Sequence, residues 1–328
     1  MCSPPLVDGL SSCPSIVKEF QLVDSLDGHT GCVNALCWSA NGEILVSGSD
    51  DTHICIWDAR DDRMQLAYVV HTGHHQNIFN VKLLPYPNDY ILVSCAADSE
   101  IRVFDLRKLV GSTHPFTASG HTTIVSETRD PDNRNITVID GSRYLIRKCI
   151  CHRRSVKRIS TISDAPFEFL SCGQDGRVLR HDLREPHRCV SSIINSRLNP
   201  NVLVDYSRFQ IEFHSISVNK FLPHLFAIGG SAEPIFLHDR RMIPNEPASG
   251  DRARSWSGRT RCVARFLPLD IPETPEPSSF TLFGSKHPTA VKFASSNSCD
   301  LIGSWSMDHI YLFNIRNSLV QSYPTKDL

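Results

Sequence analysis

Short apolar runs separated by polar turns recur along the chain at a length that suits small antiparallel sheets. The clearest runs are Cys32–Trp38, Ile44–Val46 and Ile54–Trp57. Asn41-Gly42 joins the first two runs, and this dipeptide suits a tight hairpin because both central residues of a type I′ turn need a positive φ. The pattern predicts three consecutive antiparallel strands between residues 32 and 58.

Two dipeptides frame these strands. Gly28-His29 opens the set and Trp57-Asp58 closes it, with 27 residues between them. This arrangement resembles the WD repeat, which forms one four-stranded propeller blade. A sheet this small cannot bury its faces alone, so it must stack on similar sheets. We therefore expect an all-β WD40 propeller.

In WD repeats, a His, a Ser, an Asp and a Trp form a buried hydrogen-bonded set. The matching residues in the first repeat are His29, Ser47, Asp51 and Trp57. The same His, Ser and Asp types also occur in hydrolase triads. We favour the structural role, because buried polar groups need partners and the repeat supplies them.

Four weaker copies follow. The second copy runs from Gly73-His74 to Phe104-Asp105 and the third from Cys151-His152 to His181-Asp182, whereas Gly120-His121 has no fitting partner. The buried residues that match in these two copies are His74, Ser94, Asp98, His152, Ser171 and Asp175. The fourth and fifth copies are degenerate and end at Asp239 and Asn314.

Five blades are possible in a propeller, which closes with about four to eight. WD-repeat proteins usually have seven, so we expect an incomplete ring. The expected organisation is a flexible tail over residues 1–15 and a propeller domain over 16–328. Within that domain, 109–141 and 243–281 are rich in polar residues or proline and are expected to be loop insertions.

Composition narrows the class of function. The formal net charge of the 328 residues is −1, which gives no overall attraction to nucleic acid or to an anionic membrane. No apolar run approaches the roughly 18 residues of a membrane span, and the N-terminus lacks the order of a secretory signal. Many of the 12 cysteines lie in expected strands, which favours reduced thiols in the cytoplasm or nucleus.

No metal or other cofactor is expected, and no catalytic residue. Cys149, Cys151 and His152 could bind zinc, but no second Cys or His pair follows at a suitable spacing. The basic residues between Arg143 and Arg158 could meet an acidic partner or phosphate, although a solvated strand face is favoured. A second basic cluster lies between residues 252 and 261. The sequence has no phosphate-binding glycine loop, nucleophile elbow or His-Glu-x-x-His motif.

An arginine stands two residues after the closing Asp or Asn of every repeat. These residues are Arg60, Arg107, Arg184, Arg241 and Arg316. The plain explanation is a repeated Asp–Arg ion pair in a turn. An exposed pair of this kind contributes well under about 1 kcal/mol to folding stability. Repeat ancestry alone would preserve such pairs.

The same Trp-Asp-x-Arg pattern resembles the box by which WD-repeat substrate receptors dock on the adaptor of cullin-4 RING ubiquitin ligases. Residues 26–34, 73–85, 169–176 and 310–313 also resemble this group, and the WD and tetratricopeptide repeat proteins most of all. The likeness covers about residues 16–317 outside the two insertions.

This resemblance implies a non-catalytic receptor subunit that presents an unidentified protein target for ubiquitination. It implies that Arg184 and Arg241 bind the adaptor, with Arg60 and Arg107 as the second choice. The alternative is a general WD40 scaffold in another complex. In that case, substitution of the repeated arginines would have almost no effect on function.

Overall fold

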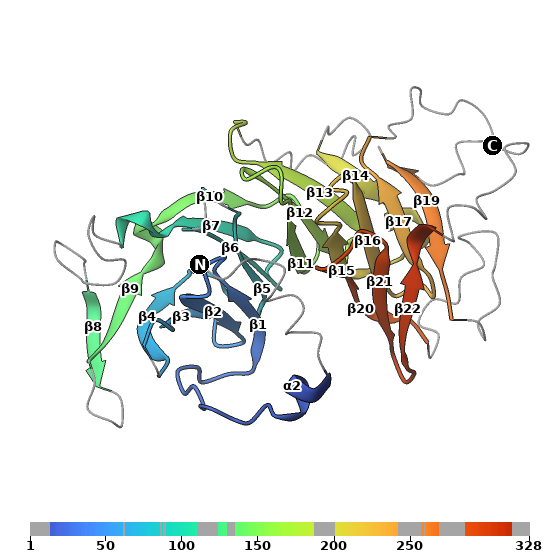
Figure 1. The fold of residues 1–328 in the computed structure, drawn as a ribbon. Coiled ribbons are helices and arrows are strands. Elements are labelled where there is room, and N and C mark those ends of the chain that lie inside the picture. Colours follow the sequence, from blue (N-terminus) through green and yellow to red (C-terminus); the bar gives the residue numbers. More distant parts are fainter. Residues whose placement is uncertain are drawn as a thin grey trace, which may run out of the picture.

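The computed structural model describes residues 14–61, 63–85, 87, 90–109, 124–129, 135–186, 201–241, 257–258, 260–268 and 286–316. In this part of the chain the strands form five sheets, which follow one another in sequence order (Figure 1). The expected WD40 propeller architecture is confirmed. The α-helix α2 (Pro14–Lys18) precedes the first sheet, and no described helix is long and apolar enough to cross a membrane.

Each sheet contains one blade of three or four strands, and neighbouring strands of a blade are antiparallel. The first blade contains β1 (Val33–Trp38), β2 (Ile44–Ser49), β3 (His53–Asp58) and β4 (Gln65–His71). The second contains β5 (Ile78–Leu83), β6 (Ile91–Ala96), β7 (Ile101–Asp105) and β10 (Leu145–Cys149). The third contains β11 (Val156–Thr161), β12 (Glu168–Gly173), β13 (Arg177–Asp182) and β14 (Val202–Asp205).

The last two blades follow the same order. The fourth contains β15 (Phe213–Val218), β16 (Leu225–Gly230), β17 (Ile235–Asp239) and β19 (Arg261–Phe266). The fifth contains β20 (Pro288–Phe293), β21 (Asp300–Trp305) and β22 (Ile310–Asn314). In every blade, the turns between the first two strands and after the third strand therefore lie at the same end.

Strands also form inside the two segments that we expected to be loop insertions. The hairpin of β8 (Ile124–Arg129) and β9 (Asn135–Asp140) lies within 109–141, and β9 pairs in parallel with β4 of the preceding blade. Within 243–281, β18 (Ser257–Gly258) pairs with β14 of the preceding blade, and β19 is the outer strand of the fourth blade. Both connections thus cover a sheet edge that would otherwise be open.

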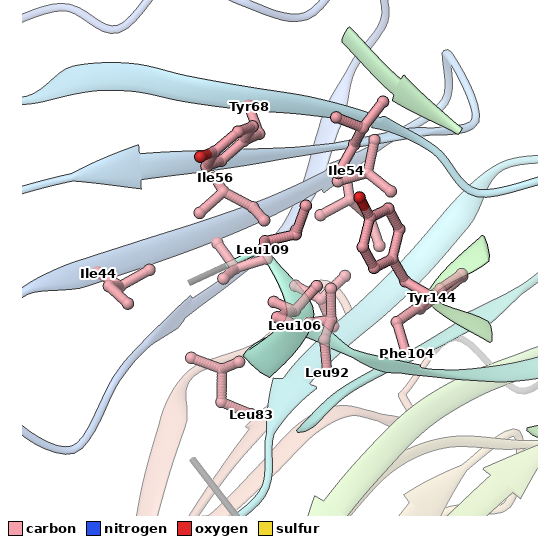
Figure 2. Packing of buried hydrophobic residues seen from close by; sticks show 14 of the residues in the cluster. Ile44, Ile54, Ile56, Tyr68, Leu83, Leu92, Phe104, Leu106, Leu109 and Tyr144 are labelled. Carbon is pink, nitrogen blue, oxygen red and sulfur yellow. The ribbon is translucent and has the colours of Figure 1, made fainter. Parts of the chain in front are cut away.

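Neighbouring blades are joined by packing between their sheets. The first strand of each later blade packs on the first strand of the blade before it. Figure 2 shows the junction of the first two blades, where Ile54 and Ile56 belong to one buried cluster with Leu92 and Phe104. Polar side chains join the first strands as well: the Asn80 Oδ1 accepts a hydrogen bond from Ile159 N (3.1 Å), and the Ser217 Oγ accepts one from Phe293 N (3.0 Å).

The two end faces of this arc are built like the interior junctions but are uncovered among the described residues. Leu36 of β1 is 60% exposed, whereas Val81, its counterpart in β5, is fully buried. Ile310 of β22 is 73% exposed, whereas its counterpart Ile54 is fully buried. No described strand of the fifth blade packs extensively on the first blade. The described sheets therefore form an open arc.

Buried polar residues hold each of the first three blades together. In the first blade, the His29 Nδ1 lies 2.9 Å from Asp51, and the His29 Nε2 lies 2.8 Å from the Ser47 Oγ. The Trp57 indole donates to the same hydroxyl (2.9 Å). In the second blade, His74 lies between Asp98 (2.9 Å) and Ser94 (2.8 Å), with Phe104 at the Trp position.

The third blade uses a second histidine in place of the tryptophan. His152 lies 3.0 Å from Asp175 and 2.8 Å from the Ser171 Oγ, which is also 2.8 Å from the His181 Nε2. Because Asp175 holds the His152 proton on Nδ1, Ser171 donates to His152 and accepts from His181. Burial acts to raise the pKa of Asp175, but the hydrogen bonds from His152 and the Arg153 backbone, with the nearby charge of Arg177, lower it overall. These His, Ser and Asp side chains are therefore engaged inside the blades.

The fourth blade replaces this set with a different chain of hydrogen bonds. The His238 Nε2 lies 3.0 Å from the Tyr206 hydroxyl, and its Nδ1 lies 3.0 Å from the Thr260 Oγ1. Since Thr260 donates to the Leu203 carbonyl, it accepts from His238, and Tyr206 donates to His238. Sequence patterns missed this arrangement because Tyr206 and Thr260 lie far from the positions of the usual His and Ser.

Burial lowers the pKa of His238 to about 3, against about 6.5 for an ordinary histidine. Since the unfolded chain takes up this proton first, folding loses stability as the pH falls from about 6.5 toward 3, at about 1.4 kcal/mol per pH unit. The substitution His238→Phe places a phenylalanine here, as Phe104 does in the second blade. We predict that between pH 7 and 5 this variant loses about 2 kcal/mol less unfolding free energy than the wild type. Urea unfolding at both values measures this difference. An unchanged loss would show that His238 titrates normally in the folded chain.

Candidate docking surface

Four of the repeated arginines bind the aspartate two residues before them. Arg107 donates to Asp105 through Nε (2.9 Å) and Nη2 (2.7 Å), and its own backbone N–H donates to the same carboxylate. The equivalent pairs are Arg60 with Asp58, Arg184 with Asp182, and Arg241 with Asp239. Because these turns follow β3, β7, β13 and β17, which are the third strands of successive blades, all four lie on one face of the propeller, which we call the arginine face.

The aspartate sets which part of each guanidinium is available to a partner. In Arg107, Arg184 and Arg241 the aspartate binds the Nε and Nη2 edge, so the Nη1 group does not take part in this pair. The side chains of Arg107, Arg184 and Arg241 are 57%, 58% and 67% exposed, and that of Arg60 is 30% exposed. The result is a row of fixed cations, a geometry that suits carboxylate recognition.

Electrostatics stabilise these pairs. The hydrogen bond from Arg184 is the largest influence on Asp182 and lowers the pKa of that carboxyl. Burial acts to raise the pKa of Asp239, but the hydrogen bonds and charge of Arg241 lower it overall. Both carboxylates are therefore ionised at neutral pH. The fifth repeat differs, because Asn314 stands in place of the aspartate and accepts from the backbone of Arg316 (3.1 Å).

The third and fourth blades share an ion cluster on this face. The Glu168 carboxylate accepts from Arg180 (2.8 and 2.9 Å) and from Arg184 (3.1 Å), and it lies 3.7 Å from Arg240. Its side chain is only 13% exposed. Arg184 is thus held by two carboxylates, and Glu168 also connects it to the fourth blade.

Arg147 holds the same turn from the second blade. This residue lies on β10, and its guanidinium donates to the carbonyls of Asp182 (2.6 Å), Leu183 (2.9 Å) and Glu185 (3.0 Å). Three neighbouring blades therefore fix the position of Arg184. In the sequence, Arg147 is one of the basic residues between Arg143 and Arg158, and no pattern singles out Glu168.

Three further residues of that basic run also have partners within the chain. Lys148 pairs with Glu100 (2.6 Å), Arg154 pairs with Glu212, and the Lys157 amine lies 3.6 Å from the centre of the Phe79 ring. The second basic cluster, between residues 252 and 261, lies largely outside the described residues, as does the side chain of Arg261 on β19.

Possible metal ligands are also engaged. Both ring nitrogens of His152 lie within hydrogen-bond distance of Asp175 or Ser171, which leaves no ring nitrogen to join Cys149 and Cys151 at a zinc ion. Among the described residues, one group of His and carboxylate side chains has metal-like spacing. Its members, His74, Asp98 and Glu100, already bind one another, Ser94 or basic side chains.

Comparison with known proteins agrees with the blade architecture. The model of the family "WD domain, G-beta repeat" matches residues 20–58 and 67–105. The chain is 33% identical over 305 residues to WD repeat protein iqw1 of Schizosaccharomyces pombe, covering 90% of this chain and 32% of the relative. It is 30% identical over 313 residues to human WD and tetratricopeptide repeats protein 1, covering 91% and 39%. The chain is thus a WD40-repeat β-propeller protein.

A further relative indicates which kind of WD40 protein the chain is similar to. Human DDB1- and CUL4-associated factor 6 is 27% identical over 311 residues, which cover 94% of this chain and 30% of that protein. The resemblance to cullin-4-associated WD40 proteins that the Trp-Asp-x-Arg pattern indicated is therefore confirmed. The chain spans between about a third and two fifths of the length of these relatives.

We predict that Arg147→Gln loosens the Asp182–Arg184 turn. The substitution removes charged hydrogen bonds to three carbonyls, and each such bond contributes about 1.5–3 kcal/mol. Amide hydrogen exchange at Leu183 and Arg184 should become at least about tenfold faster. Lys148→Gln on the same strand is the matched control, since Lys148 pairs within its own blade. Equal exchange in the wild type and Arg147→Gln would contradict the role of Arg147.

Proposed function

We propose that this chain is a non-catalytic substrate receptor of a cullin-4 RING ubiquitin ligase. It docks on the ligase adaptor, DDB1 in the name of one relative, through the part of the arginine face on the third and fourth blades. The observation that carries the proposal is the set of four guanidinium groups at one face, each held by its own aspartate. The names of the relatives support the choice of adaptor.

Arginine suits this docking role for physical reasons. It stays charged at every physiological pH, presents a rigid fork of donors and is enriched at interface hot spots. A guanidinium already fixed by the protein loses less conformational entropy when a partner binds. Arg184 and Arg241 are the primary contacts in this proposal, because both are well exposed and their blades share the Glu168 ion cluster.

The receptor contributes position and no chemical step. It brings a protein target close to the ubiquitin-loaded enzyme, and proximity of this kind can supply much of the rate. The His, Ser and Asp side chains with hydrolase-like composition support this assignment, because they are bound to one another inside the first three blades.

We predict that Arg184→Ala/Arg241→Ala weakens binding of purified DDB1 by at least about 30-fold, the effect of losing a hot spot of about 2 kcal/mol. Isothermal titration calorimetry with the full chain measures this change. Arg60→Ala/Arg107→Ala is the matched control, because it removes the same pair type from the first two blades.

Circular dichroism first establishes that all variants are folded. A folded wild-type chain that fails to bind DDB1 would overturn the proposed function and favour a scaffold role in another complex. If the control pair loses binding and the Arg184/Arg241 pair does not, docking uses the first two blades instead.

A second prediction concerns the aspartate that positions Arg241. Asp239→Asn retains an acceptor for the backbone but removes the charge that holds the guanidinium. We expect DDB1 affinity to fall about three- to tenfold, because the arginine must then be ordered on binding. Asp58→Asn in the first blade serves as the control and should bind like the wild type. Surface plasmon resonance distinguishes the two, and equal affinities would show that Asp239 has no positioning role.

A further inference from the structure

Two exposed aromatic side chains lie beside the arginines of the third and fourth blades. Most large exposed apolar residues of the described chain lie near α2, on the two end faces of the arc or on β10. Phe167 and Phe221 are different, since they lie in the turns between the first and second strands of adjacent blades. They are 36% and 49% exposed.

Hydrogen bonds place both phenylalanines on the arginine face. The Phe167 carbonyl accepts from Leu183 N (2.9 Å), and the Arg184 guanidinium lies 5.6 Å from the centre of the Phe167 ring. In the fourth blade, the His224 carbonyl at the end of the Phe221 turn accepts from Arg240 N (2.8 Å). Each aromatic turn is thus bonded directly to the arginine turn of its own blade.

The two aromatic turns are also fixed to one another. The Ser163 hydroxyl in the third blade donates to the Lys220 carbonyl in the fourth (2.9 Å). The buried Asn219 side chain accepts from the backbone N–H groups of Phe221 and Leu222 (3.0 Å each). Phe221 therefore stands on a turn anchored in the core, and both rings can meet a partner at a small cost in conformational entropy.

Between these turns lies a guanidinium with unused donor capacity. The Arg240 side chain is 19% exposed, and its nearest described carboxylate is Glu168 at 3.7 Å. The Arg240 Nε has no hydrogen-bond partner among the described residues. Burial lowers the pKa of this group, which is consistent with incomplete compensation of its charge. The Arg240 Nε is itself buried, so a partner carboxylate would meet only the exposed fifth of this side chain.

We propose that Phe167 and Phe221, with Arg184, Arg240 and Arg241, form one docking surface for an acidic segment of the ligase adaptor in which a carboxylate stands beside an apolar side chain. This inference rests on the proposed function and adds the apolar half of the interface. The rings supply the apolar contact at the centre, and the guanidinium groups bind the carboxylate and set the orientation. Aromatic and arginine side chains together are the usual composition of interface hot spots.

The test compares two exposed apolar pairs in the full chain by calorimetry with purified DDB1. Phe167→Ala/Phe221→Ala should lower the affinity at least about tenfold, the equivalent of about 1.4 kcal/mol. Ile146→Ala/Ile150→Ala is the matched control, because Ile146 of β10 and Ile150, just after that strand, are 47% and 48% exposed. The control should bind within about twofold of the wild type, since surface contacts outside a hot spot change affinity little.

Salt dependence separates the two halves of the surface. The phenylalanine pair should keep the salt dependence of the wild type, whereas Arg184→Ala/Arg241→Ala should show a weaker dependence because charge pairs are screened. If the alanine pair does not fold, Phe221→Ser alone gives the same test at the more exposed ring, because it removes the apolar contact and adds no charge.

The outcomes separate this inference from the proposed function. If the arginine pair loses binding while the phenylalanine pair binds like the wild type, the proposed function stands and the aromatic surface is rejected. An equal loss of DDB1 affinity in the phenylalanine and isoleucine variants would also reject the aromatic surface. A folded wild-type chain that does not bind DDB1 overturns both.

Discussion

Packing of one small sheet on the next is the interaction on which the rest of this structure depends. A blade has two apolar faces, and neither can be buried within the blade itself. Ile54 and Ile56 of the first blade are buried only because the second blade covers them. Stacking repeats one orientation from blade to blade, so the turns after the third strands reach the same face. The row of arginines is a consequence of that geometry, which brings single residues from distant parts of the sequence onto one surface.

Within a blade, the buried polar set tolerates changes of residue as long as every donor and acceptor finds a partner. Ser47 accepts from a Trp, and Ser171 accepts from His181 at the matching position. The fourth blade keeps neither the serine nor the aspartate and bonds His238 to Tyr206 instead. Satisfaction of buried polar groups is therefore the rule that persists when the sequence motif is lost. This explains how degenerate repeats keep the blade geometry that the proposed docking surface needs.

The sequence predicted the parts that depend on local signals. Apolar runs and turn residues located the three inner strands of each blade, and the position of each Arg after the third strand follows from the repeat itself. The outer strands were harder to predict from the sequence. For example, β10 alternates exposed and half-buried residues and has no long apolar run. The β9 and β18 strands pair with the preceding blade, which no local pattern reveals. The roles of Glu168 and Arg147 depend on which blades are neighbours, so only the structure identifies them.

The central claim is that the arginine face of the third and fourth blades binds the ligase adaptor. Hydrogen exchange of the full chain with and without DDB1 tests it most directly. The turns on the arginine face and those on the opposite face have different backbone amides, so protection of each face can be measured separately. The account predicts slower exchange on binding within residues 163–167, 182–185, 219–224 and 239–241, where the arginine and aromatic turns lie. Protection confined to the opposite turns, at residues 50–53, 97–100 and 174–177, would contradict it.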